Sequence, residues 1–158
     1  MNGKPGDKQL ITYQNLYLDI RRQFLRAGFP GAGLEAREIV CFGSGKTREE
    51  FYRDSPLYTS PEIEEAVRAL AERHTGGEPV AYLIGEWEFY GLTLEVTPAV
   101  LIPRADTEVL AEAAVEFAGR MERCRLLDLC TGSGCVGLAA AANLPGCRVP
   151  LGAVPETA

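Results

Sequence analysis

The sequence has little of what metal sites and nucleic-acid sites are built from. It contains a single histidine, and its five cysteines form no C-x-x-C pair, so it predicts no metal site. Acidic residues outnumber basic residues by 22 to 16, which gives a net charge of −6. Because phosphate contacts need clustered Lys and Arg side chains, this balance argues against direct binding of nucleic acids.

Long apolar runs and a secretory leader are also missing. No stretch approaches the roughly 20 apolar residues of a membrane-spanning helix, and the polar start MNGKPGDKQ lacks the apolar segment of a signal peptide. An odd number of cysteines without a signal peptide predicts free thiols in a cytoplasmic protein without a membrane partner. What the sequence does have is 46% hydrophobic residues over 158 positions, enough for a packed core.

Residues 1–75 are predicted to form a helical domain. From Thr12 to Arg26 the apolar residues recur at spacings of three and four, which is typical of an amphipathic helix, and Gly28 ends it. Further helices are indicated by a short apolar stripe, a capping box, and a serine followed by proline. They start near Leu34, at Thr47 with Glu50, and at Ser60-Pro61.

The lone histidine, His74, falls near the end of the last of these helices. It continues an apolar stripe of Ile63, Val67 and Leu70. A histidine at a helix C-terminus typically interacts with the helix dipole or lies on the surface. No catalytic role is therefore predicted for it.

A linker with a β-hairpin is predicted over residues 76–98. Val80 to Ile84 is apolar and β-prone, and residues 92–97 alternate between apolar and polar side chains as a half-buried strand does. The stretch 80–97 is therefore expected to be a hairpin or an extended arm. Its aromatic cluster is expected to pack between the helical domain and the next one; it consists of Trp87, Phe89 and Tyr90.

The remaining sequence alternates between helix and strand signals. A helix capped by Asp106 or Thr107 precedes a buried parallel strand at 125–129, a helix at 134–143 and a strand opening at 147–149. The first of these helices is expected to bury one stripe, formed by Leu110, Ala113, Ala114 and Phe117. Strand, glycine loop, helix and strand in this order are the first half of a doubly wound sheet, so the predicted fold class is α/β.

The strongest chemical signal is the segment DLCTGSG, from Asp128 to Gly134. A glycine-rich turn between a strand and a helix lets backbone N–H groups approach a ligand without obstruction from Cβ atoms. The helix N-terminus adds partial positive charge. Asp128 lies near the carboxyl end of its strand, where ligands of such sheets bind, and its carboxylate can hold loop amides or contact a ligand.

Three interpretations of this loop are open on the residues alone. The segment GSGCVG matches the dinucleotide fingerprint G-x-G-x-x-G, with Glu156 further on. However, Pro150 and Pro155 interrupt the strand that should carry that acid. Counted from Asp128, the pattern D-x-x-x-G-x-G is instead typical of S-adenosylmethionine enzymes. A tight turn that binds nothing is the third interpretation.

Four segments of the sequence carry a family resemblance. They are EPVAYLIG at 78–85, EFYGL at 88–92, VLIPRADTE at 100–108 and LDLCTGSG at 127–134. With them, the sequence resembles the protein-(glutamine-N5) methyltransferases that modify peptide chain release factors. The resemblance implies an N-terminal helical bundle for substrate recognition, the hairpin linker, and over residues 99–158 an incomplete Rossmann-like methyltransferase domain.

The activity that the resemblance implies is methyl transfer from S-adenosylmethionine to the side-chain amide of the glutamine in a release factor's GGQ motif. The expected partner is that release factor, and the protein is expected to be a monomer. Relatives that act on a glutamine of a ribosomal protein share these motifs. The other classes of function are a non-catalytic module that binds a release factor through residues 1–75, and a dinucleotide-binding fragment.

The resemblance also assigns cofactor contacts to two segments. Pro103 and Arg104 lie near the methionine end of the cofactor in the family. The loop holds the cofactor through residues that all follow the predicted strand or end it, namely Asp128, Cys130, Thr131, Gly132, Ser133 and Gly134.

Departures from the family pattern concern catalysis. The Asn-Pro-Pro-Tyr motif that grips the substrate amide is absent, so no catalytic residue is predicted in this sequence. An ungapped match puts Ala153 where the family has an acid for the ribose hydroxyls. After Val149 the sequence no longer resembles the family, and a truncated or frameshifted chain with little activity is expected.

Overall fold

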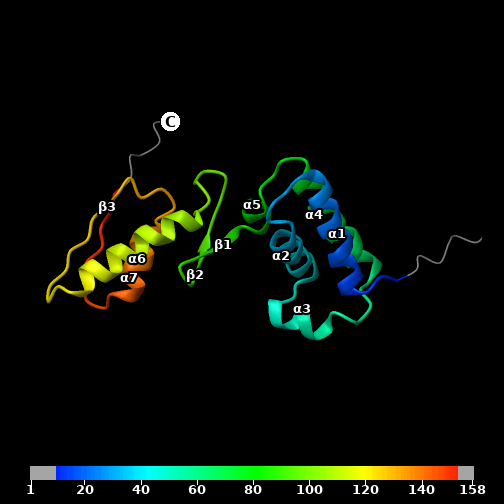
Figure 1. Cartoon of the computed structure of the whole chain (residues 1–158), viewed down its shortest axis with the longest axis horizontal. Coiled ribbons are helices and arrows are strands. Elements are labelled where there is room, and N and C mark those ends of the chain that lie inside the picture. The colour runs from blue at the N-terminus through cyan, green and yellow to red at the C-terminus, as the bar shows by residue number, and fades with distance from the viewer. Residues whose placement is uncertain (1–9, 153–158) are drawn as a thin grey trace, which may run out of the picture. The chain divides into compact units, whose positions relative to one another are not determined.

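The computed structural model describes residues 10–152, and contacts within the chain divide it into two compact units, the first ending at Ile84 and the second beginning at Gly85 (Figure 1). The first unit is helical, and the second combines helices with two small sheets of two strands each. The predicted N-terminal helical domain followed by a mixed region is confirmed at this level. The three-part division at residues 75 and 98 stays a prediction.

The helical unit owes its helix starts to local capping. Its described helices are α1 (Tyr13–Ala27), α2 (Ala32–Ser44), α3 (Arg48–Asp54), α4 (Pro61–Thr75) and α5 (Val80–Ile84). In α1, α3 and α4, the side chains of Thr12, Thr47 and Ser60 each accept a hydrogen bond from a first-turn N–H group, and the predicted capping box is present. Both α1 and α4 pack on α2.

The core of this unit comes from the apolar stripes of α1, α2 and α4. The side chains with no exposure are Leu16, Ile20, Phe24, Ala36, Ile39, Val40, Val67 and Ala71. The helices α2 and α4 approach closely at Gly43, where an added Cβ atom would lie 2.8 Å from Cγ2 of Val67. Since full burial of one large apolar side chain stabilises a fold by roughly 1.5–3 kcal/mol, this unit has a substantial core of its own.

His74 lies in this core, so the predicted surface position was wrong, whereas its place in the last turn of α4 is compatible with the predicted interaction with the helix dipole. It is 4% exposed, and its ring lies 4.8 Å from the ring of Phe24 and 4.4 Å from that of Phe29, between centroids. Its Nδ1 lies 2.8 Å from the carbonyl oxygen of Glu78, and its Nε2 lies 3.6 Å from Oε2 of Glu35. Its place on the apolar stripe of α4 explains the burial.

The segment of α5 was predicted to be extended, and it is helical. The carbonyl of Pro79 accepts hydrogen bonds from the amides of Tyr82 and Leu83, at 3.0 and 3.2 Å. Val80 and Ala81 are buried, and α5 packs on α2 and α4. These tertiary contacts outweigh the β propensity of a short apolar run.

The second unit opens with a hairpin of β1 (Glu86–Phe89) and β2 (Leu92–Glu95), within the predicted linker. The strands pair antiparallel and leave Tyr90 and Gly91 as a two-residue turn. Both turn residues have positive φ, 49° and 76°, as the type I′ turn of a tight hairpin requires. The amide of Tyr90 donates to Oε1 of Glu108 at 2.7 Å, which ties this turn to the next helix.

After the hairpin, two helices alternate with two short strands. These elements are α6 (Ala105–Gly119), β3 (Asp128–Leu129), α7 (Cys135–Asn143) and β4 (Leu151–Gly152). The helices α6 and α7 lie side by side (Figure 1). A buried cluster joins them to the hairpin and consists of Phe89, Leu94, Ala111, Cys135 and Ala139. Phe89, expected to pack between the two domains, therefore packs inside the second unit.

The face that α6 buries differs from the predicted one. Its N-cap is Arg104, which makes no side-chain cap bond, and not the predicted Asp or Thr. Ala111 and Ala118 are buried, whereas Leu110 and Phe117 of the predicted stripe are 59% and 65% exposed. Because α6 is apolar on more than one side, spacing alone does not identify the side that packs.

The strands β3 and β4 pair parallel, and a bridge between Arg125 and Arg148 continues the same register. The strand predicted to open at 147–149 begins later than expected: only Arg148 of that range forms a bridge, and β4 covers Leu151–Gly152. Between them, the carbonyl of Pro150 accepts a hydrogen bond from the amide of Asp128 at 3.0 Å. The N–H and C=O positions of one strand residue face the same side, so Pro150 offers no donor to the 125–129 segment, and regular pairing is interrupted between the bridge at Arg148 and β4.

The prediction that residues 125–129 form a buried strand was wrong for one face. Leu127 and Leu129 are 63% and 72% exposed, while Asp128 between them is half-buried. Side chains alternate across a strand, so Leu127 and Leu129 share the face opposite Asp128. Helix α7 packs on the Asp128 face, and no element within residues 10–152 buries the other.

Candidate functional site

The glycine loop joins the end of β3 to the start of α7. Cys130, Gly132 and Gly134 adopt positive φ values of 60°, 54° and 78°. The amide of Thr131 donates to the carbonyl of Gly152 at 3.0 Å, and the amide of Gly134 donates to that of Thr131 at 2.9 Å. Left-handed backbone favours glycine, so the two glycines are required by the path of the chain, and Cys130 adopts the same region at some cost.

Asp128 holds this loop from the inside. Its Oδ2 accepts the Thr131 hydroxyl at 2.7 Å and the Gly137 amide at 2.9 Å. One carboxylate oxygen thus connects the end of β3, the loop and the first turn of α7. A negative charge at a helix N-terminus is also favourable with respect to the helix dipole. The carboxylate of Asp128 was expected either to hold loop amides or to contact a ligand, and its hydrogen bonds to Thr131 and Gly137 correspond to the first role.

Gly137 belongs to the same arrangement, although it is not among the predicted cofactor-binding residues. An added Cβ atom at this position would lie 2.2 Å from Cδ2 of Leu151 and 3.0 Å from Oδ2 of Asp128. Only glycine lets α7 approach the strands this closely. The last glycine of GSGCVG was the available signal, since that position of the fingerprint serves helix–strand packing.

The outer side of the loop is open. An added Cβ atom at Gly132 would meet no atom within 4 Å, and Ser133 beside it is half-buried. Gly134 is the N-cap of α7 without a side-chain cap bond, and the first amides of a helix have no intrahelical partners. The Gly137 amide is held by Asp128, so the donors left for the polar groups of a nucleoside-bearing cofactor are the amides that precede it in this turn.

The two segments predicted to bind the cofactor differ in how they are connected. The loop residues from Asp128 to Gly134 are brought together by the bonds above. Pro103 is buried and Arg104 exposed at the start of α6, and no hydrogen bond in the described part of the chain joins either to the loop. Ala153 and Glu156, discussed as positions of a ribose acid, lie outside the described residues.

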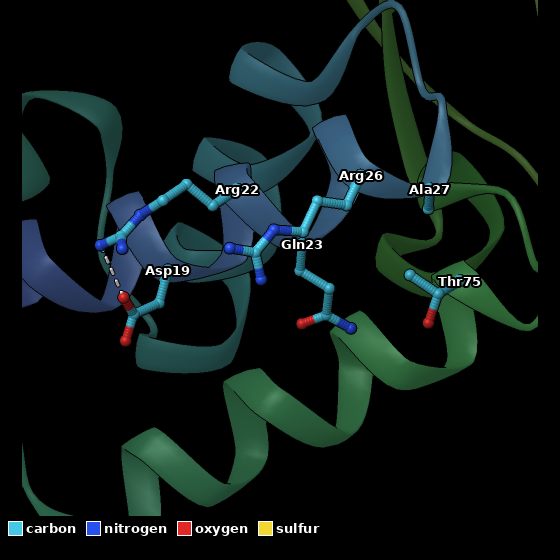
Figure 2. Close-up of a pocket in the computed structure, with 6 residues that line it drawn as sticks. All are labelled: Asp19, Arg22, Gln23, Arg26, Ala27 and Thr75. Atoms are coloured by element: carbon cyan, nitrogen blue, oxygen red, sulfur yellow. Dashed lines mark hydrogen bonds and ion pairs between the residues drawn. The ribbon is translucent and has the colours of Figure 1, made fainter.

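A second candidate surface lies in the helical unit, where a shallow pocket of about 590 Å³ opens between α1 and the end of α4. Figure 2 shows Gln23 pointing from α1 toward α4, and the Arg26 guanidinium alongside it. Arg22 is held by Asp19 through an ion pair of 2.9 Å. The lining, which Thr75 completes at the end of α4, offers guanidinium and amide donors for carboxylates or carbonyls of a partner.

Residues 10–152 contain neither a cluster of metal ligands nor a helix suited to cross a membrane. No group of three His, Cys, Asp or Glu side chains there is placed to hold a metal ion. In the same range, no helix has both the length and the apolar character that crossing a bilayer demands.

Comparisons with known proteins match both parts of the chain. The model of the PrmC N-terminal domain family matches residues 15–85. A release factor glutamine methyltransferase of Thermodesulfovibrio yellowstonii is 41% identical over 113 residues, covering 70% of this chain and 40% of the relative. Enzymes of the same name from Vibrio cholerae and Geobacter sulfurreducens are 37% and 38% identical, over 85% and 84% of this chain and 47% and 46% of theirs.

These matches confirm the predicted resemblance to the N-terminal portion of release factor glutamine methyltransferases. The chain spans less than half the length of these relatives. The matches over 84–85% of the chain extend well beyond the helical unit, into the segment that carries the glycine loop.

Proposed function

We propose that this chain, which is related to the N-terminal portion of release factor glutamine methyltransferases, serves an S-adenosylmethionine-dependent methyl transfer to a protein glutamine. In this proposal the helical unit recognises a release factor and the glycine loop binds the cofactor. The observation that supports it best is the loop itself, fastened by Asp128 to both β3 and α7 and open on its outer side. The second unit is then the beginning of a Rossmann-like domain, and the protein acts in the cytoplasm.

The residues of this chain that would hold the cofactor are those of the loop. In this proposal the amides before Gly137 at the start of α7 and the Ser133 hydroxyl bind its polar groups, while the hydrogen bond from Gly137 to Asp128 keeps the loop in position. Bound S-adenosylmethionine supplies an electrophilic methyl group. An amide nitrogen is a poor nucleophile, so the chemistry depends on orienting the glutamine and stabilising its polarised form.

Calorimetry separates this proposal from the dinucleotide alternative. We expect the 158-residue chain to bind S-adenosylmethionine and not NAD. Gly132→Val places a side chain in the open space over the loop and should abolish binding. The matched control is Gly146→Val, because Gly146 also has positive φ, 92°, and open surroundings but lies after α7. Equal loss in both variants, or tighter binding of NAD, would contradict the proposed cofactor site.

A methyl-transfer assay tests the catalytic part of the proposal. The sequence contains no Asn-Pro-Pro-Tyr, so we expect the 158-residue chain by itself to transfer negligible label from radioactive cofactor to a GGQ-containing release factor. Turnover near that of a full-length relative would contradict the role given to that motif. A ribosomal protein substrate in a parallel arm distinguishes the two classes of acceptor.

The helical unit supports a second function that needs no catalysis. It has its own core and is the part matched by the PrmC N-terminal domain family. We expect residues 1–84 alone to retain a release factor in a pull-down, and Arg26→Glu in the α1–α4 pocket to weaken retention at least tenfold. Arg123→Glu in the full chain is the matched charge reversal outside this unit. Retention by residues 85–158 instead would overturn the assignment.

A further inference from the structure

Cys124 and Cys147 lie opposite each other where the two parallel segments begin. Arg125 pairs with Arg148 across the two segments. Cys124 and Cys147 each precede one of these arginines by one residue, so the same register places the two cysteines beside each other. The amide of Arg148 donates to the carbonyl of Cys124 at 3.2 Å, which fixes this neighbourhood. Side chains at equivalent register positions of adjacent strands project to the same face, with the strands about 4.8 Å apart.

The two thiols also interact with each other. Hydrogen bonding with the Cys147 side chain, followed by desolvation, raises the pKa of the Cys124 thiol. Both cysteines are free and half-buried, so reagents of small size can reach them. Neither thiol contributes to the core cluster of the second unit or to the glycine loop.

The other three cysteines have no comparable neighbour. Cys41 is buried in the helical unit, and burial raises the pKa of its thiol to about 11. Cys135 is buried in the core cluster of the second unit. Cys130 is exposed but lies at the far end of β3, roughly 20 Å along the chain from Cys124 at the rise of an extended strand.

We propose that Cys124 and Cys147 are a reversible dithiol–disulfide pair that a low-molecular-weight disulfide such as oxidised glutathione converts to the cross-linked form. The spacing of adjacent strands falls within the Cα separation of about 4.4–6.8 Å that disulfides require. Pairing therefore needs rotation of two side chains and little movement of the backbone.

The reaction has two thiol–disulfide exchanges. The Cys147 thiolate attacks one sulfur of oxidised glutathione, forms a mixed disulfide and releases one glutathione thiolate. Cys124, after losing its proton to solvent, attacks the Cys147 sulfur and displaces the second glutathione. The protein loses two thiol protons and two electrons, and one small disulfide becomes two small thiols.

The cross-link would close a ring that contains β3, the glycine loop and α7. It ties together the N-terminal ends of the paired segments, whereas the loop lies at their carboxyl ends. A closed ring of this kind stabilises mainly by restricting the unfolded chain. We therefore expect oxidation to raise the denaturant midpoint of the second unit, followed by the fluorescence of Trp87, and dithiothreitol to reverse the shift.

Peptide mapping tests the pair directly. We use Cys130→Ser as the parent, because it removes the most accessible competing thiol and leaves the pair intact. After treatment with oxidised glutathione, trypsin should release the dipeptide Cys124-Arg125 joined to residues 126–148, since it cleaves after Arg123, Arg125 and Arg148. Two protein thiols should disappear, and no glutathione should remain attached.

The double variant Cys130→Ser/Cys147→Ser is the control. It should form no cross-link and should carry glutathione on Cys124 instead. A cross-link that persists in this variant, for example to Cys135, would overturn the assignment. Separate mixed disulfides on Cys124 and Cys147 in the parent, or no reaction of either thiol, would overturn it as well. Circular dichroism of both variants verifies that the helices are unchanged.

Discussion

The helical unit and the second unit bury their apolar residues to different extents. In the helical unit, Phe24 and Val67 have no exposure and belong to a core contributed by three helices. The second unit builds its smaller core around Phe89, while Phe117 and Leu129 are 65% and 72% exposed. Both units leave some large apolar side chains exposed, such as Leu25 and Phe42 in the helical unit, so the contrast lies in the size of the core.

The two units also differ in the local features that stabilise their helices and strands. Three helices of the helical unit begin with a side-chain cap, whereas α6 and α7 begin without one. The parallel pair carrying the glycine loop has two residues per strand. Binding loops are commonly drawn from the less stable parts of a fold. We therefore expect two unfolding transitions, with the fluorescence of the single tryptophan, Trp87, following the second unit.

The largest effect is expected from emptying the core of the helical unit. Phe24→Ala removes a side chain with no exposure and leaves a cavity, which should cost about 3–5 kcal/mol. Chemical denaturation followed by far-ultraviolet circular dichroism should show an early loss of helix. If the units unfold separately, the transition of Trp87 fluorescence stays where it is.

The matched variant in the second unit is Phe117→Ala. Phe117 is 65% exposed, so we expect its removal to change stability by less than about 0.5 kcal/mol. A cost equal to that of Phe24→Ala would mean that Phe117 is covered in solution. The contrast between the two units would then disappear.

The same contrast explains how far the fold could be predicted. In the helical unit, the Thr47 capping box and Ser60 are local signals, and apolar periodicity predicts the helix that follows Thr12, so these three helix starts agree with the structure. In α6, Leu110 and Phe117 suggested an inward stripe, but the packed side carries Ala111. When a helix is apolar on several sides, its sequence does not identify the side that packs against the rest of the unit.

The candidate site was predicted in part for a similar reason. The loop from Asp128 to Gly134 could be predicted, because its backbone needs positive φ values that glycine adopts readily, and the glycines can be recognised in the sequence. The hydrogen bond from Gly137 to Asp128 was not foreseen, because it depends on how closely α7 approaches the strands. The pairing of Cys124 with Cys147 depends on register, which a β segment containing Pro150 does not reveal.

A smaller effect is expected from filling the closest contact of the second unit. Gly137→Ala would put a Cβ atom 2.2 Å from Leu151 and disturb the bond to Asp128, so we expect a cost of about 1–3 kcal/mol in the Trp87 transition. Gly119→Ala is the control, because its Cβ atom would meet Leu144 at an ordinary 3.5 Å. Equal destabilisation by both would show that the approach of α7 is looser than described.

Helix capping provides a comparison on the scale of about 1 kcal/mol. Ser60→Ala removes the side-chain acceptor for the amide of Ile63 at the start of α4, and should cost that amount. Arg104→Ala replaces the N-cap of α6, which makes no such bond, and should change stability by less than about 0.5 kcal/mol. Thermal unfolding followed by circular dichroism measures both, and a larger loss for Arg104→Ala would reverse the ranking of the two units.

The smallest effect concerns acid, and it too should be confined to the helical unit. Hydrogen bonds from Arg53 and Lys46 hold the pKa of Asp54 below its usual value. A carboxylate with a lowered folded-state pKa contributes stability above the unfolded value of about 3.9, and this contribution is lost as the pH falls further. Asp54→Asn should therefore flatten the acid-induced decline in helix stability below about pH 4. As a control, Asp106→Asn removes a carboxylate from the second unit and should leave the acid-induced decline unchanged. If helix stability falls with pH equally steeply in the native chain and in Asp54→Asn, then Asp54 is not the cause of the decline.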